Sequence, residues 1–227
     1  MIPSLQKNYG ASAIQATRHR VLRNTYWLLA LSMIPTVLGA YVGVQTGLLM
    51  LTGGFGLLMF LVIAFGFMFA IEKTKNSAAG VPVLLGFTFF MGLMLAPLLM
   101  YTLHFRNGPA LIMGACLGTG AVFATMATIA TVSKRDFSGM GSWLFAGLIV
   151  VVLASLANFF LHLPALYLAT LVLGTLIFTG LLLFDVQRVV NGGETNYIRA
   201  TLSIYLDLYN LFSMMLQLLG IGFGQRD

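Results

Sequence analysis

Residues 163–187 read LPALYLATLVLGTLIFTGLLLFDVQ, and residues 200–225 read ATLSIYLDLYNLFSMMLQLLGIGFGQ. Each stretch exceeds the roughly 20 apolar residues that a helix needs to cross a bilayer. Each also contains a single charged residue, Asp185 in the first and Asp207 in the second, 22 positions apart. A lone carboxylate is costly inside a membrane, so its default interpretation is functional.

The composition of the whole chain predicts the same class of protein. Of its 227 residues, 59% are hydrophobic and only 8% are charged. A soluble protein of this size needs more polar surface than that. The apolar runs are continuous, which favours helices over a β-barrel, whose strands alternate in segments of about 10 residues. We therefore expect an all-α membrane protein, without a cleaved signal peptide because the N-terminus is polar.

Seven spans are expected within a transmembrane domain of residues 25–221, between an N-terminal tail (1–24) and a short C-terminal tail (222–227). Polar or helix-breaking loops separate them. The loop at 191–196 predicts a helix end closed by glycine and a new helix capped by Thr195 or Asn196. The expected spans are 25–45, 48–71, 80–103, 109–132, 140–161, 164–190 and 197–221.

The distribution of basic residues predicts the orientation. A cytoplasmic N-terminus places ten of the 12 Lys and Arg residues on the cytoplasmic side and leaves Arg106 and Arg226 outside. With seven spans the C-terminus is then periplasmic, unless the last segment re-enters the membrane and returns. The basic residues are scattered through short loops, so membrane orientation explains the net charge of +6 better than a nucleic-acid partner does.

The last span carries a polar face. Ser203, Asp207, Asn210 and Gln217 recur at helical spacing, within about 80° of one another around the helix axis. We expect this face to point into the protein interior or a water-filled cavity, because lipid exposure would be costly. A structural carboxyl group that hydrogen-bonds across helices is the alternative for Asp207. For Asp185 the alternative is a local ion pair with Arg188, three positions on.

Small residues form a face on two other spans. They let helices approach closely, so both faces predict packing surfaces. The residues are Ser32, Thr36, Gly39 and Gly43 in the first span, and Gly114, Gly118, Ala121, Thr125 and Thr128 in the fourth.

The two aspartates lie at similar depths. At about 1.5 Å per residue, Asp207 is about 12 Å from Arg199 and Asp185 about 9 Å from Asn191. The two spans are antiparallel neighbours joined by a short loop. This geometry allows contact between the carboxyl groups without requiring it. Oxygens within hydrogen-bond reach would support a shared proton, and a separation beyond about 8 Å would leave two unrelated polar groups.

Several short motifs occur in order along the chain, and together they resemble the Bax inhibitor-1 family, within it the bacterial YccA branch. The resemblance covers nearly the whole sequence. It rests on VLRNTY (21–26), KRDFSGMG (134–141), FDVQ (184–187), GGETNYI (192–198) and YLDLYNLF (205–212).

The resemblance implies a seven-helix bundle with the last helix at its centre, and a pH-sensitive calcium leak. In that scheme Asp185 and Asp207 form the proton-sensing pair on the ion pathway, and they meet a passing Ca²⁺ only transiently. Carboxylate oxygens are the ligands that Ca²⁺ prefers. Ser203, Asn210 and Gln217 extend the polar path. No resident cofactor and no enzymatic activity are implied.

The resemblance also implies a cytoplasmic lock and a second function. Family members have an arginine on the second helix that locks the closed pair, but residues 48–71 contain no basic residue. Lys73, Lys75 and Arg188 are the candidates to replace it. The alternative function, from the YccA branch, is a non-conducting modulator of the membrane AAA+ protease FtsH, which would engage the N-terminal tail.

Three other functional classes fit the sequence poorly. A retinal protein needs an intramembrane lysine, whereas all four lysines lie in expected tails or loops. An intramembrane aspartyl protease would have a Tyr-Asp pair, but Phe184 precedes Asp185. A zinc site would need clustered ligands, and the three histidines, His19, His104 and His162, lie in separate tails or loops.

Overall fold

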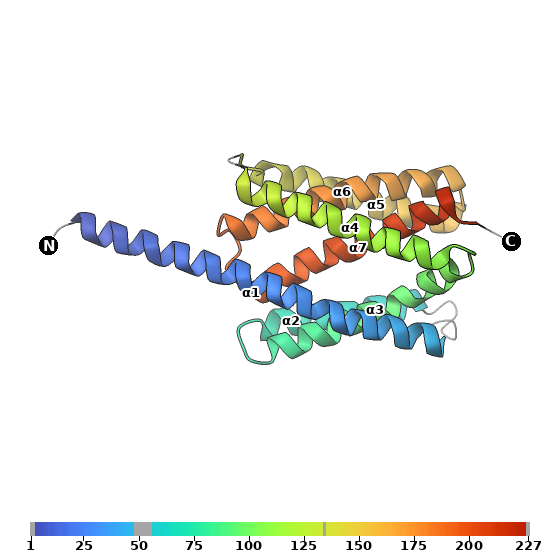
Figure 1. Ribbon diagram of the computed structural model, residues 1–227, viewed down its shortest axis with the longest axis horizontal. Helices are drawn as coiled ribbons and strands as arrows, with labels where there is room; N and C mark the ends of the chain where they lie inside the picture. Colours follow the sequence, from blue (N-terminus) through green and yellow to red (C-terminus); the bar gives the residue numbers. More distant parts are fainter. Residues whose placement is uncertain (1–2, 48–55, 134, 226–227) are drawn as a thin grey trace.

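The computed structural model describes residues 3–47, 56–133 and 135–225. All regular secondary structure in this part of the chain is helical, as the composition predicts. Figure 1 shows the helices side by side in an elongated bundle, with α1 projecting from one end. They are α1 (Pro3–Thr46), α2 (Gly56–Thr74), α3 (Gly80–Leu103), α4 (Gly108–Val132), the 3-10 turn η2 (Ser138–Met140), α5 (Gly141–Leu161), α6 (Pro164–Val190) and α7 (Tyr197–Phe223).

The predicted spans agree closely with the helices. Spans 80–103 and 164–190 coincide with α3 and α6. Six helices in the described residues are long and apolar enough to cross a membrane, namely α1 from Arg18 onward, α3, α4, α5 with η2, α6 and α7. The expected second span, 48–71, falls partly outside the described residues, and α2 covers its remainder without being one of the six.

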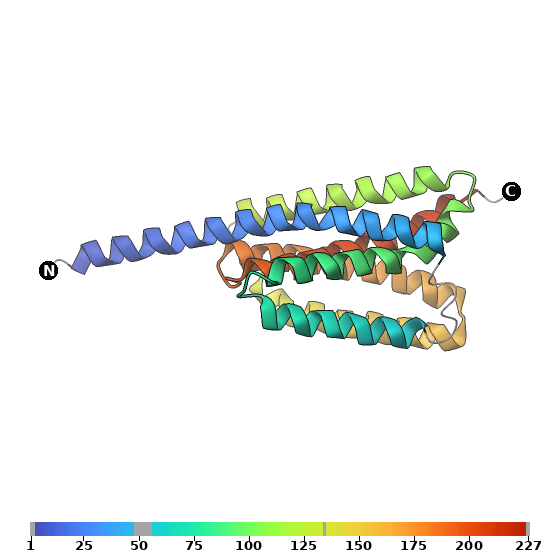
Figure 2. The ribbon, with the colours of Figure 1, turned by 90° about the horizontal axis from the view of Figure 1, so that it is seen from below.

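Helix α1 begins much earlier than the expected first span. It contains 44 residues, which corresponds to about 66 Å of helix. Its N-terminal part extends well beyond the bundle in both views (Figures 1 and 2). The segment expected to be a tail therefore continues the first membrane helix, and its backbone is helical from Pro3 onward.

The two ends of the bundle differ in charge. The α2–α3, α4–α5 and α6–α7 loops lie at the end from which α1 projects, and the last turn of α7 lies at the opposite end (Figure 1). We call the first of these the basic end. Its loops and helix ends carry most of the cations, which are Arg18, Arg20, Arg23, Lys73, Lys75, Arg135, Arg188 and Arg199.

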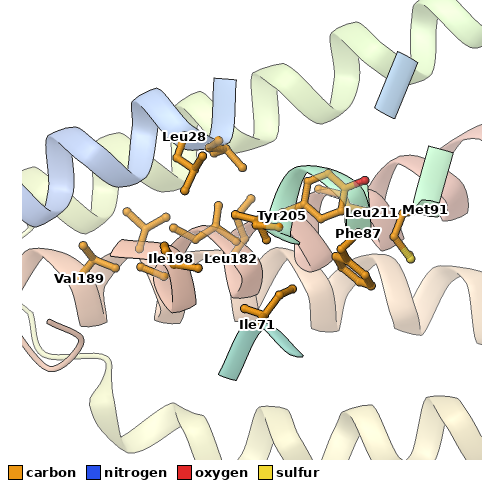
Figure 3. Close-up of a cluster of buried hydrophobic side chains, with 14 of the residues drawn as sticks. Leu28, Ile71, Phe87, Met91, Leu182, Val189, Ile198, Tyr205 and Leu211 are labelled. Atoms are coloured by element: carbon orange, nitrogen blue, oxygen red, sulfur yellow. The ribbon is translucent and has the colours of Figure 1, made fainter. Parts of the chain in front are cut away.

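Helix α7 packs against α1, α2, α3, α4 and α6. Figure 3 shows its residues Ile198, Tyr205 and Leu211 inside the largest apolar cluster, with Leu182 of α6 and Phe87 of α3. The rings of Phe87 and Tyr205 meet edge to face with centroids 6.4 Å apart. Tyr205 lies on the other side of α7 from the predicted polar face and is nevertheless buried, so α7 is enclosed on both sides.

The small-residue face of α1 packs as predicted, and that of α4 does so only in part. A Cβ atom at Gly39 would lie 2.1 Å from the carbonyl oxygen of Phe89 on α3, so the two backbones touch. On α4, a Cβ atom at Gly118 would meet Met215 of α7 at 2.5 Å. Ala121, Thr125 and Thr128 are exposed instead, and the two threonine hydroxyls donate to their own helix.

The α6–α7 loop has the predicted glycine closure and asparagine cap. Gly192 adopts a φ of +78°, and the amide of Gly193 donates to the carbonyl of Arg188 at 2.8 Å. Asn196 Oδ1 accepts from the amides of Ile198 and Arg199 at 3.0 and 3.1 Å. The Nδ2 group of Asn196 also donates to Lys75 O and Asn76 Oδ1 in the α2–α3 loop.

Replacing Asn196 with alanine should destabilise the protein more than an ordinary cap loss. The cap costs about 1–2 kcal/mol, and the bonds to the α2–α3 loop are lost with it. We expect a midpoint of thermal unfolding several degrees lower, at about 2–4 °C per kcal/mol, as measured by circular dichroism in detergent. Thr195→Ala is the control, because Thr195 is exposed and does not cap the helix. Equal midpoints for the two variants would contradict this role.

Candidate functional site: a buried pair of carboxyl groups

The structure brings Asp185 of α6 and Asp207 of α7 together. Their side chains lie within hydrogen-bonding reach of each other. Because an ionised carboxylate is not a donor, a hydrogen bond between them would require one of the two groups to hold a proton. The helices are antiparallel across a short loop, which is what made the meeting feasible from the sequence.

The pair sits in apolar surroundings. Asp207 is 5% exposed, and Ile204 and Leu211 on its own helix are fully buried. Leu182 and Val186, on either side of Asp185 along α6, are fully buried as well. One oxygen of Asp207, Oδ2, receives no hydrogen bond from an N–H or O–H group of the described residues. Burial of a fully ionised carboxylate without donors is costly, so this environment favours a pair that holds a proton.

The predicted polar face does not form a hydrogen-bonded chain with the pair. Asn210 Nδ2 donates to the Leu206 carbonyl at 2.8 Å, and Gln217 Nε2 donates to the Ser213 carbonyl at 2.9 Å. Gln217 also accepts a hydrogen bond from the hydroxyl of Tyr167 on α6. Ser203 is partly buried. These amides therefore bond to their own helix or to Tyr167.

A network of charges closes the basic end near the pair. Arg199 Nε lies 3.5 Å from Glu72 Oε2 and 3.9 Å from Glu194 Oε2. Arg188 Nη2 lies 3.9 Å from the same Glu194 oxygen. Lys75 forms an ion pair with Glu72, in which its ammonium group donates a hydrogen bond to the carboxylate. This hydrogen bond is the main reason that the pKa of Glu72 lies below its usual value. The network joins α2, the α6–α7 loop and α7.

The three lock candidates occupy this end of the bundle, but in the described residues none forms an ion pair with either aspartate. Lys75 pairs with Glu72, and Lys73 lies 4.7 Å from the centroid of the Phe69 ring. Arg188 pairs with Glu194 rather than with Asp185; Arg188 is exposed, whereas Asp185 is only partly exposed. The cation of Arg188 still acts on Asp185 through space.

Glu194 was not singled out from the sequence. Its side chain is only 13% exposed and faces both arginines. Its Oε1 also accepts from the amides of Thr195 and Asn196 at 3.0 and 2.9 Å. The position of Glu194 in the sequence could have indicated this role, because it lies between the glycine pair that ends α6 and the asparagine that caps α7.

The described residues hold no cluster of three or more His, Cys, Asp or Glu side chains that could bind a metal ion. The aspartate pair alone offers four carboxylate oxygens, fewer than the six to eight ligands that Ca²⁺ takes. Any cation here would keep part of its water shell.

Comparisons with known proteins identify the family. Residues 18–224 match the family described as inhibitor of apoptosis-promoting Bax1. A protein of Escherichia coli K12 named modulator of FtsH protease YccA is 41% identical over 209 residues, which cover 92% of each chain. Its counterpart in Escherichia coli O6:H1 is named inner membrane protein YccA. An uncharacterised membrane protein of Vibrio cholerae is 38% identical over 204 residues, or 89% of this chain and 90% of its own length.

The order of the motifs, the helical bundle and these comparisons all indicate the same family. The match begins at Arg18, where α1 becomes apolar enough to span a membrane. It ends at Gly224, directly after α7. This chain is a multi-pass membrane protein and belongs to the Bax inhibitor-1 family, within its bacterial YccA branch.

Proposed function

We propose that this protein modulates an FtsH-type membrane AAA+ protease. The observation that carries the proposal is the 41% identity, over 92% of both chains, to a protein named for that role. A sequence that is similar over its whole membrane domain presents a similar surface within the bilayer. The protease is accordingly the partner that the relatives favour.

The projecting part of α1 is the segment that we assign to protease contact. It leaves the bundle at the basic end (Figure 1), which the positive-inside rule places in the cytoplasm. It is a single helix continuous with the first span. A rigid helix holds its far end at a fixed position relative to the membrane, which suits contact with a membrane-anchored partner.

The proposed topology has seven spans, with α2 as the additional one, the N-terminus in the cytoplasm and the C-terminus in the periplasm of the inner membrane. Two observations support it. The end of α7 lies opposite the end from which α1 projects (Figure 2), as an odd number of crossings requires. Helix α7 contacts five other helices, which fits a central position.

Deletion of residues 2–17 tests the protease proposal. The deletion leaves the matched family region, which starts at Arg18, intact. We expect loss of co-purification with the protease and relief of its inhibition, measured as degradation of a membrane substrate in reconstituted vesicles. A variant with the same residues in scrambled order controls for helix length and charge. Full inhibition by both altered proteins, or no protease in pull-downs of the wild type, would remove the proposal.

We also propose a second function, in which the Asp185–Asp207 pair makes passage of a cation such as Ca²⁺ depend on pH. The support is that the two carboxyl groups lie within hydrogen-bonding reach in a buried, apolar site. While the proton is held, the pair is joined and closes the path. Loss of the proton leaves two adjacent negative charges that repel each other and attract a cation. The protein acts in this scheme as a gated path and not as an enzyme.

A further inference from the structure

A cavity of about 540 Å³ lies along the side of the bundle, away from the aspartate pair. Helices α1 and α4 form its walls and α7 its floor, with Met33 and Val37 from α1, Phe123 from α4, and Leu208 and Phe212 from α7. We call it the lateral groove. Val37 is 66% exposed, so the groove opens toward the outside of the bundle. Because α1 is a candidate membrane span over this stretch, the groove faces lipid there.

A shallow, open depression lies along α1 at the basic end, lined by residues of α1 alone. Its lining includes His19, Arg20 and Arg23, and we call it the basic pocket. Tyr26 lines both the basic pocket and the lateral groove, so they adjoin at this ring. Tyr26 also meets Phe123 of α4 edge to face, with centroids 6.0 Å apart. The basic pocket and the lateral groove thus form one site with a charged end and an apolar end.

The polar groups of the basic pocket are uncompensated. The ion pairs within the described residues use Lys75, Arg188 and Arg199 but neither Arg20 nor Arg23. The hydroxyl of Tyr26 is buried and has no hydrogen-bond partner in the described part of the chain. Two exposed arginines three residues apart on one helix are suited to a phosphate group, because guanidinium binds phosphate oxygens in a fork.

The length of the lateral groove matches a lipid tail. From Tyr26 to Val37 the lining on α1 extends over 11 residue steps, or about 17 Å of helix. One leaflet contributes about half of the roughly 30 Å hydrocarbon core of a bilayer. Arg20 and Arg23 lie where the first membrane span begins, at Arg18, which is the depth of the headgroups. The apolar end and the charged end are therefore spaced as in a phospholipid.

We propose that this composite site binds one anionic phospholipid of the surrounding leaflet, with its phosphate at Arg20 and Arg23 and an acyl chain in the lateral groove over α7. Basic pockets beside membrane helices recognise lipid headgroups in this way. Neither arginine has an acidic partner among the described residues. Their two positive charges therefore favour a lipid with a net negative charge over a zwitterionic one.

Native mass spectrometry of the full chain in detergent tests the charged end. Phosphatidylglycerol should remain bound as one molecule per chain, with phosphatidylcholine bound more weakly. At about 1 kcal/mol per arginine near the membrane surface, Arg20→Gln/Arg23→Gln should weaken phosphatidylglycerol binding by about thirtyfold. Arg106→Gln/Arg135→Gln removes the same charge outside the site and should leave binding unchanged. Equal loss in both double variants, or equal retention of the two lipids, would overturn the proposal.

A leucine that fills the lateral groove tests the apolar end. Gly120 lines the groove, and a Cβ atom added there would meet nothing within 4 Å. Gly120→Leu should therefore fold normally and lose the bound phosphatidylglycerol. Gly66→Leu is the control, since Gly66 on α2 is equally open. Unchanged lipid binding in Gly120→Leu, with inorganic phosphate competing fully, would indicate a phosphate site instead. A change of oligomeric state in that variant would assign the groove to a second copy. Either result overturns the lipid proposal.

Discussion

Asp207→Asn is expected to abolish the pH dependence of cation flux through the reconstituted protein. Asparagine keeps the size of the side chain but has no titratable proton, so the switch with Asp185 is lost. A switch that responds to one proton changes its population ratio by about tenfold per pH unit. In the wild type we expect flux to rise by at least about tenfold from pH 5 to pH 8. In the variant the ratio should fall to about one.

The direction of the pH effect follows from the carboxyl–carboxyl bond. At low pH the proton is present and the hydrogen bond between Asp185 and Asp207 holds α6 and α7 together. As the pH rises the proton leaves, and two like charges in an apolar site repel each other. Acid should therefore close the path and alkaline conditions should open it. Ca²⁺ entry into vesicles that contain a fluorescent indicator measures the flux.

The matched control for this experiment is Asp136→Asn. Hydrogen bonds from the Ser138 side chain and backbone lower the pKa of Asp136, so this loop carboxylate stays ionised throughout the tested range. Its variant should keep the wild-type profile. Asp185→Asn should reproduce Asp207→Asn, and the double variant should add nothing, because the pair acts as one unit. A wild type that passes no Ca²⁺, or an Asp207→Asn variant with an unchanged profile, would end the conduction proposal.

Gly39→Ala is expected to destabilise the bundle severely. The added Cβ atom would lie 2.1 Å from the Phe89 carbonyl oxygen, an impossible distance against backbone. Gly92 on α3 is the reciprocal case, since its Cβ atom would lie 2.1 Å from the Thr36 carbonyl oxygen. Overpacking usually costs about 1–3 kcal/mol, and backbone on backbone offers less room to relax. We expect a loss at or above the upper end of that range, measured as thermal unfolding in detergent.

Gly66→Ala provides the comparison for this effect. A Cβ atom at Gly66, inside α2, would meet nothing within 4 Å, so alanine there should be neutral or slightly stabilising through its better helix propensity. The same comparison separates steric cost from a general effect of glycine replacement. A Gly39→Ala variant as stable as Gly66→Ala would mean that α1 and α3 do not approach as closely as the structure has them.

Sequence patterns predicted most of the helices because a bilayer imposes a simple rule on each segment. The apolar run from Gly80 to Leu103 must be a helix of membrane length, whatever its neighbours are. The glycine closure and the Asn196 cap were predicted for a similar reason, since both are made within a few residues. The early start of α1 at Pro3 was missed because its N-terminal part lies outside the apolar run and carries no membrane signal.

Two local facts, the lone acid in each span and the short loop between antiparallel helices, made contact between the aspartates feasible, and the family resemblance implied that they form a pair. The surroundings of the pair were predicted less well. The alternative of a local ion pair between Asp185 and Arg188 is not formed, because the loop turns Glu194 toward both arginines and Arg188 pairs with that acid. Only the polar face of α7 was expected to point into the protein. Tyr205, on the opposite face of the helix, is buried as well.

By itself the sequence determined that this is a helical membrane protein of the Bax inhibitor-1 family, where its helices lie, and that Asp185 and Asp207 are its exceptional residues. The helices and the exceptional aspartates follow from the free energy of placing each segment in lipid, which depends on that segment alone, whereas the family follows from the order of short motifs. Only the tertiary structure decided that the two carboxyl groups lie within hydrogen-bonding reach, that Glu194 faces two arginines of the basic end, and that α1, α4 and α7 enclose a groove. Such contacts depend on how each helix is rotated and in what register it packs against the others, and no single segment encodes that.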